Sequence, residues 1–187
     1  IFLNFFKKNI SLILACTFDG GIGVNNNIPW KISSDLKKFK NITSTTNHSE
    51  LNNAIIMGSN TYKSLPVSYL PNRINIVISK TKEIEKYNKN IRVFSDINEA
   101  IIYCNYNNLI ESIFIIGGAQ IYNHFLTNYK HIDNIYLSLI REKYFCDTHI
   151  NMNIIFERFY FIKDTNYTTD NDKYISYICK RKNYNKT

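Results

Sequence analysis

Short apolar runs that alternate with longer stretches of helical spacing are the feature that most constrains the fold of this chain. Runs rich in Ile, Val and Tyr predict strands, and apolar residues at helical spacing predict the helices between them. This alternation is typical of a largely parallel sheet with crossover helices. The predicted strands are residues 10–17, 53–57, 74–79, 91–94, 112–116 and 131–139. The predicted helices are residues 34–42, 61–64, 97–103 and 120–127.

The last part of the chain shows a different pattern. Residues 158–163 and 173–181 have the composition of two strands around the polar turn 168–172, which predicts an antiparallel hairpin at the sheet edge. Asp96, followed three residues later by Glu99, predicts a capping box at the start of the third helix.

A chain of 187 residues suits one compact core. We therefore predict a single three-layer α/β domain with a mostly parallel central sheet of about eight strands, a C-terminal antiparallel hairpin at the edge and four flanking helices. The domain is expected to cover residues 10–182, with 1–9 as an N-terminal extension and 183–187 as a C-terminal tail. The polar segment 43–52 is expected to be a surface loop.

The net charge of +8 raises nucleic acid as a possible partner. Five of the positive residues lie near the ends, where basic segments mostly serve solvation, and the same charge attracts small anionic molecules. These five are Lys7, Lys8, Lys180, Arg181 and Lys182. The aromatic residues follow core periods instead of lying among Lys and Arg, so a nucleic-acid-binding module is the weaker alternative and no obligatory nucleic acid is expected.

The cysteines and the apolar runs indicate in which cellular compartment the chain is expected. Four cysteines lie far apart without a CxxC pair, which predicts neither a zinc site nor a dense disulfide framework. No metal and a reduced, cytoplasmic location are therefore expected. No apolar run approaches the roughly 20 residues that span a bilayer, so no membrane partner is expected.

The long segment 19–30 lies between the first strand and the first helix and contains three glycines. A loop of this length predicts a mobile functional lid. Beyond it, Asp35 lies in the first helical turn, and Phe39 shares its face. Asp35 either complements the positive end of the helix dipole or is a half-buried acid, walled by Trp30, Leu36 and Phe39, whose pKa is raised by desolvation.

The wider sequence favours the second interpretation. Ile28-Pro29-Trp30, with Asp35 five residues after the Trp and Phe39 and Thr43 at further steps of four, resembles the signature of the dihydrofolate reductase family. Further blocks resemble that family in the same order: residues 11–15, 22–23, 56–66, 70–79, 115–122, 136–138 and 147–149.

The resemblance implies reduction of dihydrofolate to tetrahydrofolate by NADPH. Asp35 is then the only ionisable side chain in the pterin pocket and promotes protonation of N5, with Trp30 as the second catalytic-site residue. Taken alone, Arg73 is interpreted as a solvated charge on the surface. The resemblance implies that it pairs with the α-carboxylate of the substrate's glutamate tail. Ser138 stands where the family usually has Thr. The implied substrate-binding residues are Ile13, Ala15, Asp35, Leu36, Phe39, Leu65, Leu70, Arg73, Ile116, Tyr122 and Ser138.

The resemblance also implies where NADPH binds. Gly117-Gly118, between an apolar strand and a helix, lets backbone N–H groups approach a pyrophosphate, and the family often has a cis peptide there. Ser59 stands where the family usually offers Arg or Lys to the 2′-phosphate, so Lys80 or Asn60 would have to supply that contact. The implied cofactor-binding residues are Ala15, Ile22, Gly23, Ile28, Gly58, Ser59, Asn60, Thr61, Ser79, Lys80, Gly117, Gly118, Ala119, Gln120, Ile121 and Tyr122.

Two further alternatives concern the class of protein and its assembly. A reductase of the riboflavin pathway resembles this fold and also takes NADPH, but it lacks the Pro-Trp signature with Asp five residues on. The expected partners are dihydrofolate and NADPH, with the chain either a monomer or a domain fused to thymidylate synthase.

Overall fold

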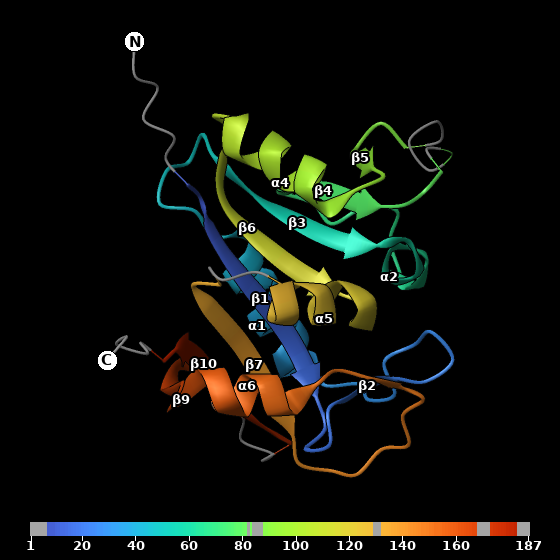
Figure 1. The fold of residues 1–187 in the computed structure, drawn as a ribbon, viewed down its shortest axis with the longest axis vertical. Helices are drawn as coiled ribbons and strands as arrows, with labels where there is room; N and C mark the ends of the chain where they lie inside the picture. The colour runs from blue at the N-terminus through green and yellow to red at the C-terminus, as the bar shows by residue number, and fades with distance from the viewer. Residues whose placement is uncertain (1–6, 82, 84–87, 129–131, 168–172, 183–187) are drawn as a thin grey trace.

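The centre of the fold is an eight-stranded sheet in the order β5-β4-β3-β6-β1-β7-β10-β9 (Figure 1). The computed structural model describes residues 7–81, 83, 88–128, 132–167 and 173–182. All pairs from β5 to β7 are parallel, whereas β10 is antiparallel to both β7 and β9. The predicted mostly parallel sheet and its antiparallel edge pair are confirmed, and the turn predicted at 168–172 lies outside the described residues. The strands are β1 (Asn9–Cys16), β3 (Asn52–Gly58), β4 (Arg73–Ile78), β5 (Ile91–Phe94), β6 (Ile110–Gly117), β7 (Asn134–Ile140), β9 (Phe159–Lys163) and β10 (Tyr174–Arg181).

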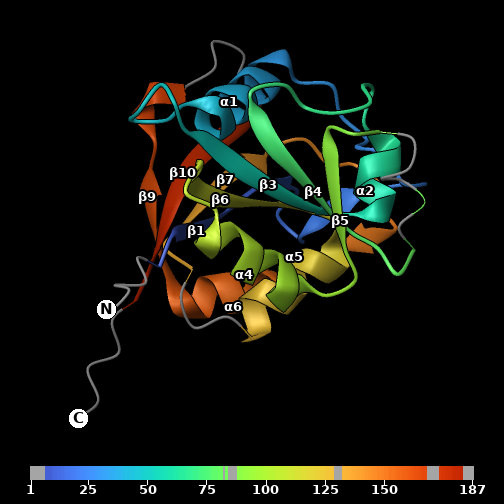
Figure 2. The same cartoon turned by 90° about the horizontal axis from the view of Figure 1, so that it is seen from above.

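Helices cover both faces of this sheet, which gives the three predicted layers. Figure 2 shows α1 (Ser33–Ser44) on one face and α4 (Ile97–Tyr106), α5 (Ala119–Asn128) and α6 (Met152–Arg158) on the other. The short helix α2 (Ser59–Ser64) follows β3 directly and lies at the carboxyl end of the parallel strands. In open α/β sheets ligands bind at that end, so it is the edge of interest.

The strands alternate their side chains between the two faces, and each face has its own apolar cluster. Leu12 and Leu14 of β1 belong to the larger cluster, which includes residues of α4, α5 and α6. Ile13, between them, belongs to a second cluster with Phe39 and Ile42 of α1. The period of two in the strands thus separates a structural core from an apolar face beneath α1.

Two elements differ from the prediction. The four predicted flanking helices are present, and the described residues form a fifth, α6, which was not predicted. This helix begins where the Asn151 side chain accepts a hydrogen bond from the Asn153 N–H at 3.1 Å, and it buries Met152 and Ile155. Its seven residues are too few for a periodic signal.

The predicted surface loop 43–52 is also partly wrong. Helix α1 continues to Ser44, and Thr43 is fully buried, so only residues 45–51 connect α1 to β3. At the third predicted helix, the Asp96 carboxylate accepts from the N–H groups of Asn98 and Glu99 at 2.7 and 3.3 Å, as a helix cap does. No helix in the described part of the chain is long and apolar enough to cross a membrane.

Candidate active site

Asp35 lies in the first turn of α1 and is half-buried. Loss of water around the carboxyl raises its pKa, while a hydrogen bond from the Ser138 side chain on β7 and the nearby Lys38 ammonium oppose this rise. The prediction of a half-buried acid with a raised pKa is confirmed in both respects. As predicted, the Ser138 hydroxyl hydrogen-bonds Asp35, at a position where the family usually has Thr.

The apolar residues predicted around the acid gather mostly in the cluster beneath α1. Ile13 and Ile116 are its buried strand residues, and Phe39, Leu65 and Leu70 pack against it from α1 and from the segment after α2. These five residues come from separate parts of the chain, and the sheet brings them together on one face. The structure therefore forms one apolar cluster beneath α1, the helix that carries Asp35.

Three other predicted residues lie differently. Leu36 is 60% exposed, so it does not wall Asp35 from water in this structure. Trp30 is buried in a third cluster, against which Ala15 packs, and its ring meets Tyr144 edge-on at 5.4 Å between centroids. Trp30 thereby fixes the segment that leads into α1.

Arg73 begins β4, whereas the sequence placed it on the preceding loop. Only 8% of the residue is exposed; its Nε donates to the Pro71 carbonyl at 3.0 Å and an Nη donates to Thr43 Oγ1 at 2.8 Å. Burial lowers the pKa of the guanidinium. Among the described residues no carboxylate forms an ion pair with it. A buried, oriented cation of this kind is suited to an anionic ligand.

Two strand-to-helix turns lie side by side at the carboxyl edge of the sheet. Met57 pairs with Gly117 between β3 and β6, and a Cβ at Gly118 would lie 3.1 Å from Thr61 Oγ1. The Gly117-Gly118 peptide is cis, as the sequence hypothesis held, and Gly117 has a φ of +108°. A side chain at Gly118 would crowd the first turn of α2, so glycine keeps the two turns in contact.

Tyr122 lies under this pair of turns instead of lining an open surface. It is buried, and its hydroxyl donates to the Ile13 carbonyl at 2.7 Å. A Cβ at Gly117 would lie 2.8 Å from the Tyr122 ring. The remaining predicted cofactor residues of this region, Ala119 and Ile121, are half-buried, and Gln120 is exposed.

The predicted lid is ordered by a small second sheet. Residues Gly21–Gly23 form β2, which pairs antiparallel with β8 (Thr148–His149). The Asp147 carboxylate accepts from the Asn25 N–H at 2.8 Å, and the Asp147 N–H donates to the Gly23 carbonyl at 3.0 Å. Residues 147–149 thus hold the lid, whereas its mobility stays a prediction. Of its predicted cofactor residues, Ile22 is half-buried and Ile28 is 60% exposed.

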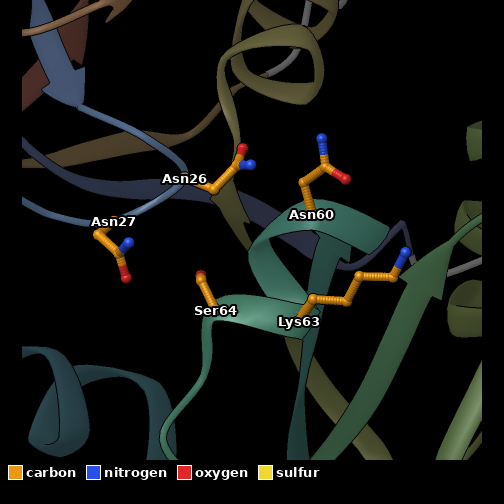
Figure 3. Close-up of a pocket in the computed structure, with 5 residues that line it drawn as sticks. All are labelled: Asn26, Asn27, Asn60, Lys63 and Ser64. Carbon is orange, nitrogen blue, oxygen red and sulfur yellow. The ribbon is translucent and has the colours of Figure 1, made fainter.

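Two cavities flank α2. One, of about 180 Å³, is lined by Asn26 and Asn27 of the lid and by Asn60, Lys63 and Ser64 of α2. Figure 3 shows the two lid residues across from α2, with the Lys63 side chain extending away from the lid. The other, of about 380 Å³, is lined by Ser59, Lys63, Ser79, Lys80, Thr81 and Glu83. Asp35 lines neither cavity. The second joins three predicted cofactor residues, Ser59, Ser79 and Lys80, with a second lysine.

Sequence reasoning missed two residues here, Lys38 and Lys63. Lys38 is buried beside Asp35, and its spacing of three residues from Asp35 on a helix was the available signal. Lys63 lines both cavities, but nothing in its local sequence separates it from other exposed lysines.

Parallel strands that end in touching glycine turns, with one partly desolvated carboxyl on the neighbouring face, are typical of an α/β enzyme that binds its ligands at the carboxyl ends of its strands. A sequence profile of dihydrofolate reductase matches residues 9–186. The chain belongs to the dihydrofolate reductase family. The reaction of this family is the reduction of dihydrofolate in folate metabolism.

Individual relatives agree with the profile. The chain is 36% identical over 148 residues to a bifunctional dihydrofolate reductase-thymidylate synthase of Paramecium tetraurelia, covering 79% of this chain and 29% of that protein. It is 33% identical over 140 residues to the dihydrofolate reductase of Drosophila melanogaster, covering 74% and 76%. For that of Heliothis virescens the identity is 34% over 146 residues, covering 76% and 78%. The chain therefore matches most of the single-function relatives and under a third of the bifunctional one.

Proposed function

We propose that this chain reduces 7,8-dihydrofolate to 5,6,7,8-tetrahydrofolate with NADPH, and that Asp35 is the acid on which protonation of N5 depends. The observation that carries the proposal is the half-buried Asp35 carboxyl, bonded to Ser138 next to an apolar face of the sheet. A pterin needs such a face for its ring and one carboxylate for its 2-amino and N3 edge.

The chemistry divides between the cofactor and the chain. When bound, NADPH supplies the hydride that reaches C6 of the pterin. Asp35 orients the pterin and promotes the arrival of a proton at N5, since hydride addition to a neutral imine would build negative charge there. Ser138 holds the Asp35 carboxylate, and the cluster of Ile13, Phe39 and Ile116 keeps water from the reacting face.

The buried Arg73 guanidinium supports a substrate with an anionic tail. Its Nε and one Nη are already held by Pro71 and Thr43, which fixes the plane of the fork. We propose that it binds the α-carboxylate of the glutamate tail.

The two glycine turns and the neighbouring cavities fit the cofactor. Gly58, Gly117 and Gly118 carry no side chain of their own, and backbone N–H groups in such strand-to-helix turns suit a pyrophosphate. The cavity lined by Ser59, Lys63 and Lys80 offers two cations to a 2′-phosphate. We propose that these lysines replace the basic residue that Ser59 does not supply, and that they select NADPH over NADH.

The relatives show two arrangements of the domain, alone and joined to thymidylate synthase. Both are compatible with this chain. Reading the complete open reading frame distinguishes a stand-alone enzyme from the reductase part of a bifunctional protein.

The test is the oxidation of NADPH followed at 340 nm, with and without dihydrofolate, in wild type, Asp35→Asn and the control Glu50→Gln. Glu50 is exposed in the loop between α1 and β3. We expect Asp35→Asn to lose most activity at neutral pH and less at acid pH, where the substrate is already protonated, and Glu50→Gln to match wild type. Loss of NADPH without dihydrofolate, or an Asp35→Asn variant as active as wild type at neutral pH, contradicts the proposal.

A further inference from the structure

Lys38 is a charged residue at a buried position of α1. It lies on α1 three residues after Asp35, so the two side chains share a face of the helix. Only 1% of Lys38 is exposed, and it is among the largest fully buried side chains of the described residues. Lysine is almost never fully buried unless its ammonium is paired, so a compensating interaction is required.

The compensation consists of hydrogen bonds to strand β7. Nζ of Lys38 donates to Ser138 Oγ at 2.9 Å and to the Leu137 carbonyl at 3.3 Å. Because the ammonium only donates, the Ser138 hydroxyl accepts from Lys38 and keeps its own proton to donate to Asp35. Lys38, Ser138 and Asp35 thus form a chain of hydrogen bonds with one direction.

The charged and titratable groups around Lys38 come from its own helix and from two further segments. Asp35 lies on its own helix, Asp164 follows β9, and Tyr174 and Cys179 lie on β10. The Lys38 ammonium stands 5.7 Å from the centroid of the Tyr174 ring.

The Asp164 carboxylate already accepts two hydrogen bonds from other groups. Its carboxylate accepts from the Asn166 N–H at 3.1 Å and from Ser176 Oγ at 3.4 Å. Within the part of the chain that the structure describes, no carboxylate oxygen lies within 4.0 Å of Lys38 Nζ. The ammonium is therefore not neutralised by a contact ion pair, and its field reaches both carboxylates.

We propose that Lys38 is a positioning residue for the reaction: its buried ammonium, connected to Asp35 through the Ser138 hydroxyl, keeps the active-site carboxyl ionised and in one orientation. The role in turnover rests on the proposed function, whereas the coupling between the two side chains does not. Without Lys38, only the Ser138 hydrogen bond would oppose the effect of burial on Asp35, and its protonated form would be favoured more.

The titration behaviour of the two groups is consistent with this arrangement. Burial raises the pKa of Asp35, and the Lys38 ammonium lowers it. Burial also lowers the pKa of Lys38 to about 8, against the attraction of Asp35, Asp164 and Cys179. Lys38 is therefore charged at neutral pH. It loses its charge at mildly alkaline pH, where it no longer lowers the pKa of Asp35.

The direct test is the titration of Asp35 in the full chain without ligands, followed by NMR of ¹³C-labelled aspartate carboxyls, with Asp35→Asn assigning the signal. In Lys38→Met we expect the midpoint of Asp35 to rise by on the order of one pH unit, because the opposing cation is gone. Lys38→Arg keeps the charge and should leave the midpoint near that of wild type. Lys37→Met removes an exposed charge from α1 and is the matched control.

The reciprocal measurement keeps the proposal testable if Lys38→Met does not fold. Coupling is mutual, so Asp35→Asn should lower the midpoint of Lys38, followed through the ¹⁵N signal of its side chain. An Asp35 midpoint unchanged in Lys38→Met, or a Lys38 midpoint unchanged in Asp35→Asn, would overturn the proposal.

Turnover separates this inference from the proposed function. If the enzyme reduces dihydrofolate, Lys38→Met should shift the pH profile of kcat in the same direction as the Asp35 midpoint, with a smaller change in KM. If the midpoints move but the wild type does not reduce dihydrofolate, the coupling stands and the proposed function fails.

Discussion

The pKa values of two aspartates in this chain, Asp19 and Asp35, are shifted in opposite directions. Asp19 is exposed, and a hydrogen bond from the Thr17 hydroxyl is the main reason that its pKa is lowered. Asp35 is partly desolvated on α1, and its pKa is raised. The residue type supplies a carboxyl in both cases, and the surroundings decide whether it suits proton chemistry.

At the residue scale, the buried Lys38 predicts a dependence of stability on pH. The pKa of Lys38 falls from 10.5 in the unfolded chain to about 8 in the fold, so burying the ammonium costs about 3 kcal/mol at neutral pH. Between these two values the unfolded chain binds more protons, and the fold gains stability as pH rises. Lys38→Met removes this cost, since Met fills a similar volume without a charge.

We therefore expect Lys38→Met to unfold at a higher denaturant concentration than wild type at pH 7. The advantage should shrink as pH rises from about 8 toward 10.5. Urea unfolding at several pH values measures it, with Lys37→Met as the control. A Lys38→Met variant that is less stable than wild type at every pH would show that the ammonium is a net stabilising group.

At the element scale, α1 carries the acid, its cation and an apolar wall on one face, with Asp35, Lys38 and Phe39 in little more than one turn. The lid depends on a different kind of element, since β2 has only three residues and its partner β8 only two. So short a pairing has little stability of its own. Asp147 adds a charged acceptor for the Asn25 N–H next to that pairing.

Asp147→Ala should therefore loosen the lid without changing the core. We expect faster hydrogen exchange at the Asn25 amide, a KM for NADPH severalfold higher and a lower kcat, because the Asn25 N–H loses its acceptor. The melting temperature should stay close to that of wild type. Lys143→Ala, in the same segment, is the control, and equal exchange at Asn25 in wild type and Asp147→Ala would contradict the role given to this contact.

At the scale of the whole molecule, the site exists only because the parallel strands end together. Gly58 ends β3, Gly117 ends β6 beside it, and Ser79 follows β4 one strand further out. Side chains from segments far apart in the sequence, Ser59 and Lys63 of α2 and Ser79 and Lys80 after β4, thus line one cavity.

Binding of NADPH should stabilise the folded chain, since a ligand that binds only the native state raises its melting temperature. NADH should do so less at equal concentration. Lys63→Met should reduce the ratio of the affinities for NADPH and NADH by about tenfold or more, which corresponds to the loss of one hydrogen bond to a charged group. Lys163→Met, on β9 at the far edge of the sheet, is the control. If NADPH and NADH raised the melting temperature of the wild type equally, Lys63 and Lys80 would not be binding the 2′-phosphate.

Prediction from sequence succeeded where a residue's role follows from local pattern. The strand periods located the sheet to within three residues at each described boundary, and the spacing from Trp30 to Asp35 pointed to a carboxyl that is half-buried in the fold. It failed for α6, which is too short to show a period, and for Lys38, because charged residues are expected in solvent.

The sequence by itself determined the alternation of strands and helices and the family, because hydrophobic period and ordered motifs are properties of neighbouring residues. Only the tertiary structure decided that Lys38 is buried against Ser138, that Thr43 orients Arg73 and that Lys63 shares a cavity with Lys80. Burial, and with it the state of a charge, depends on segments that meet only after folding.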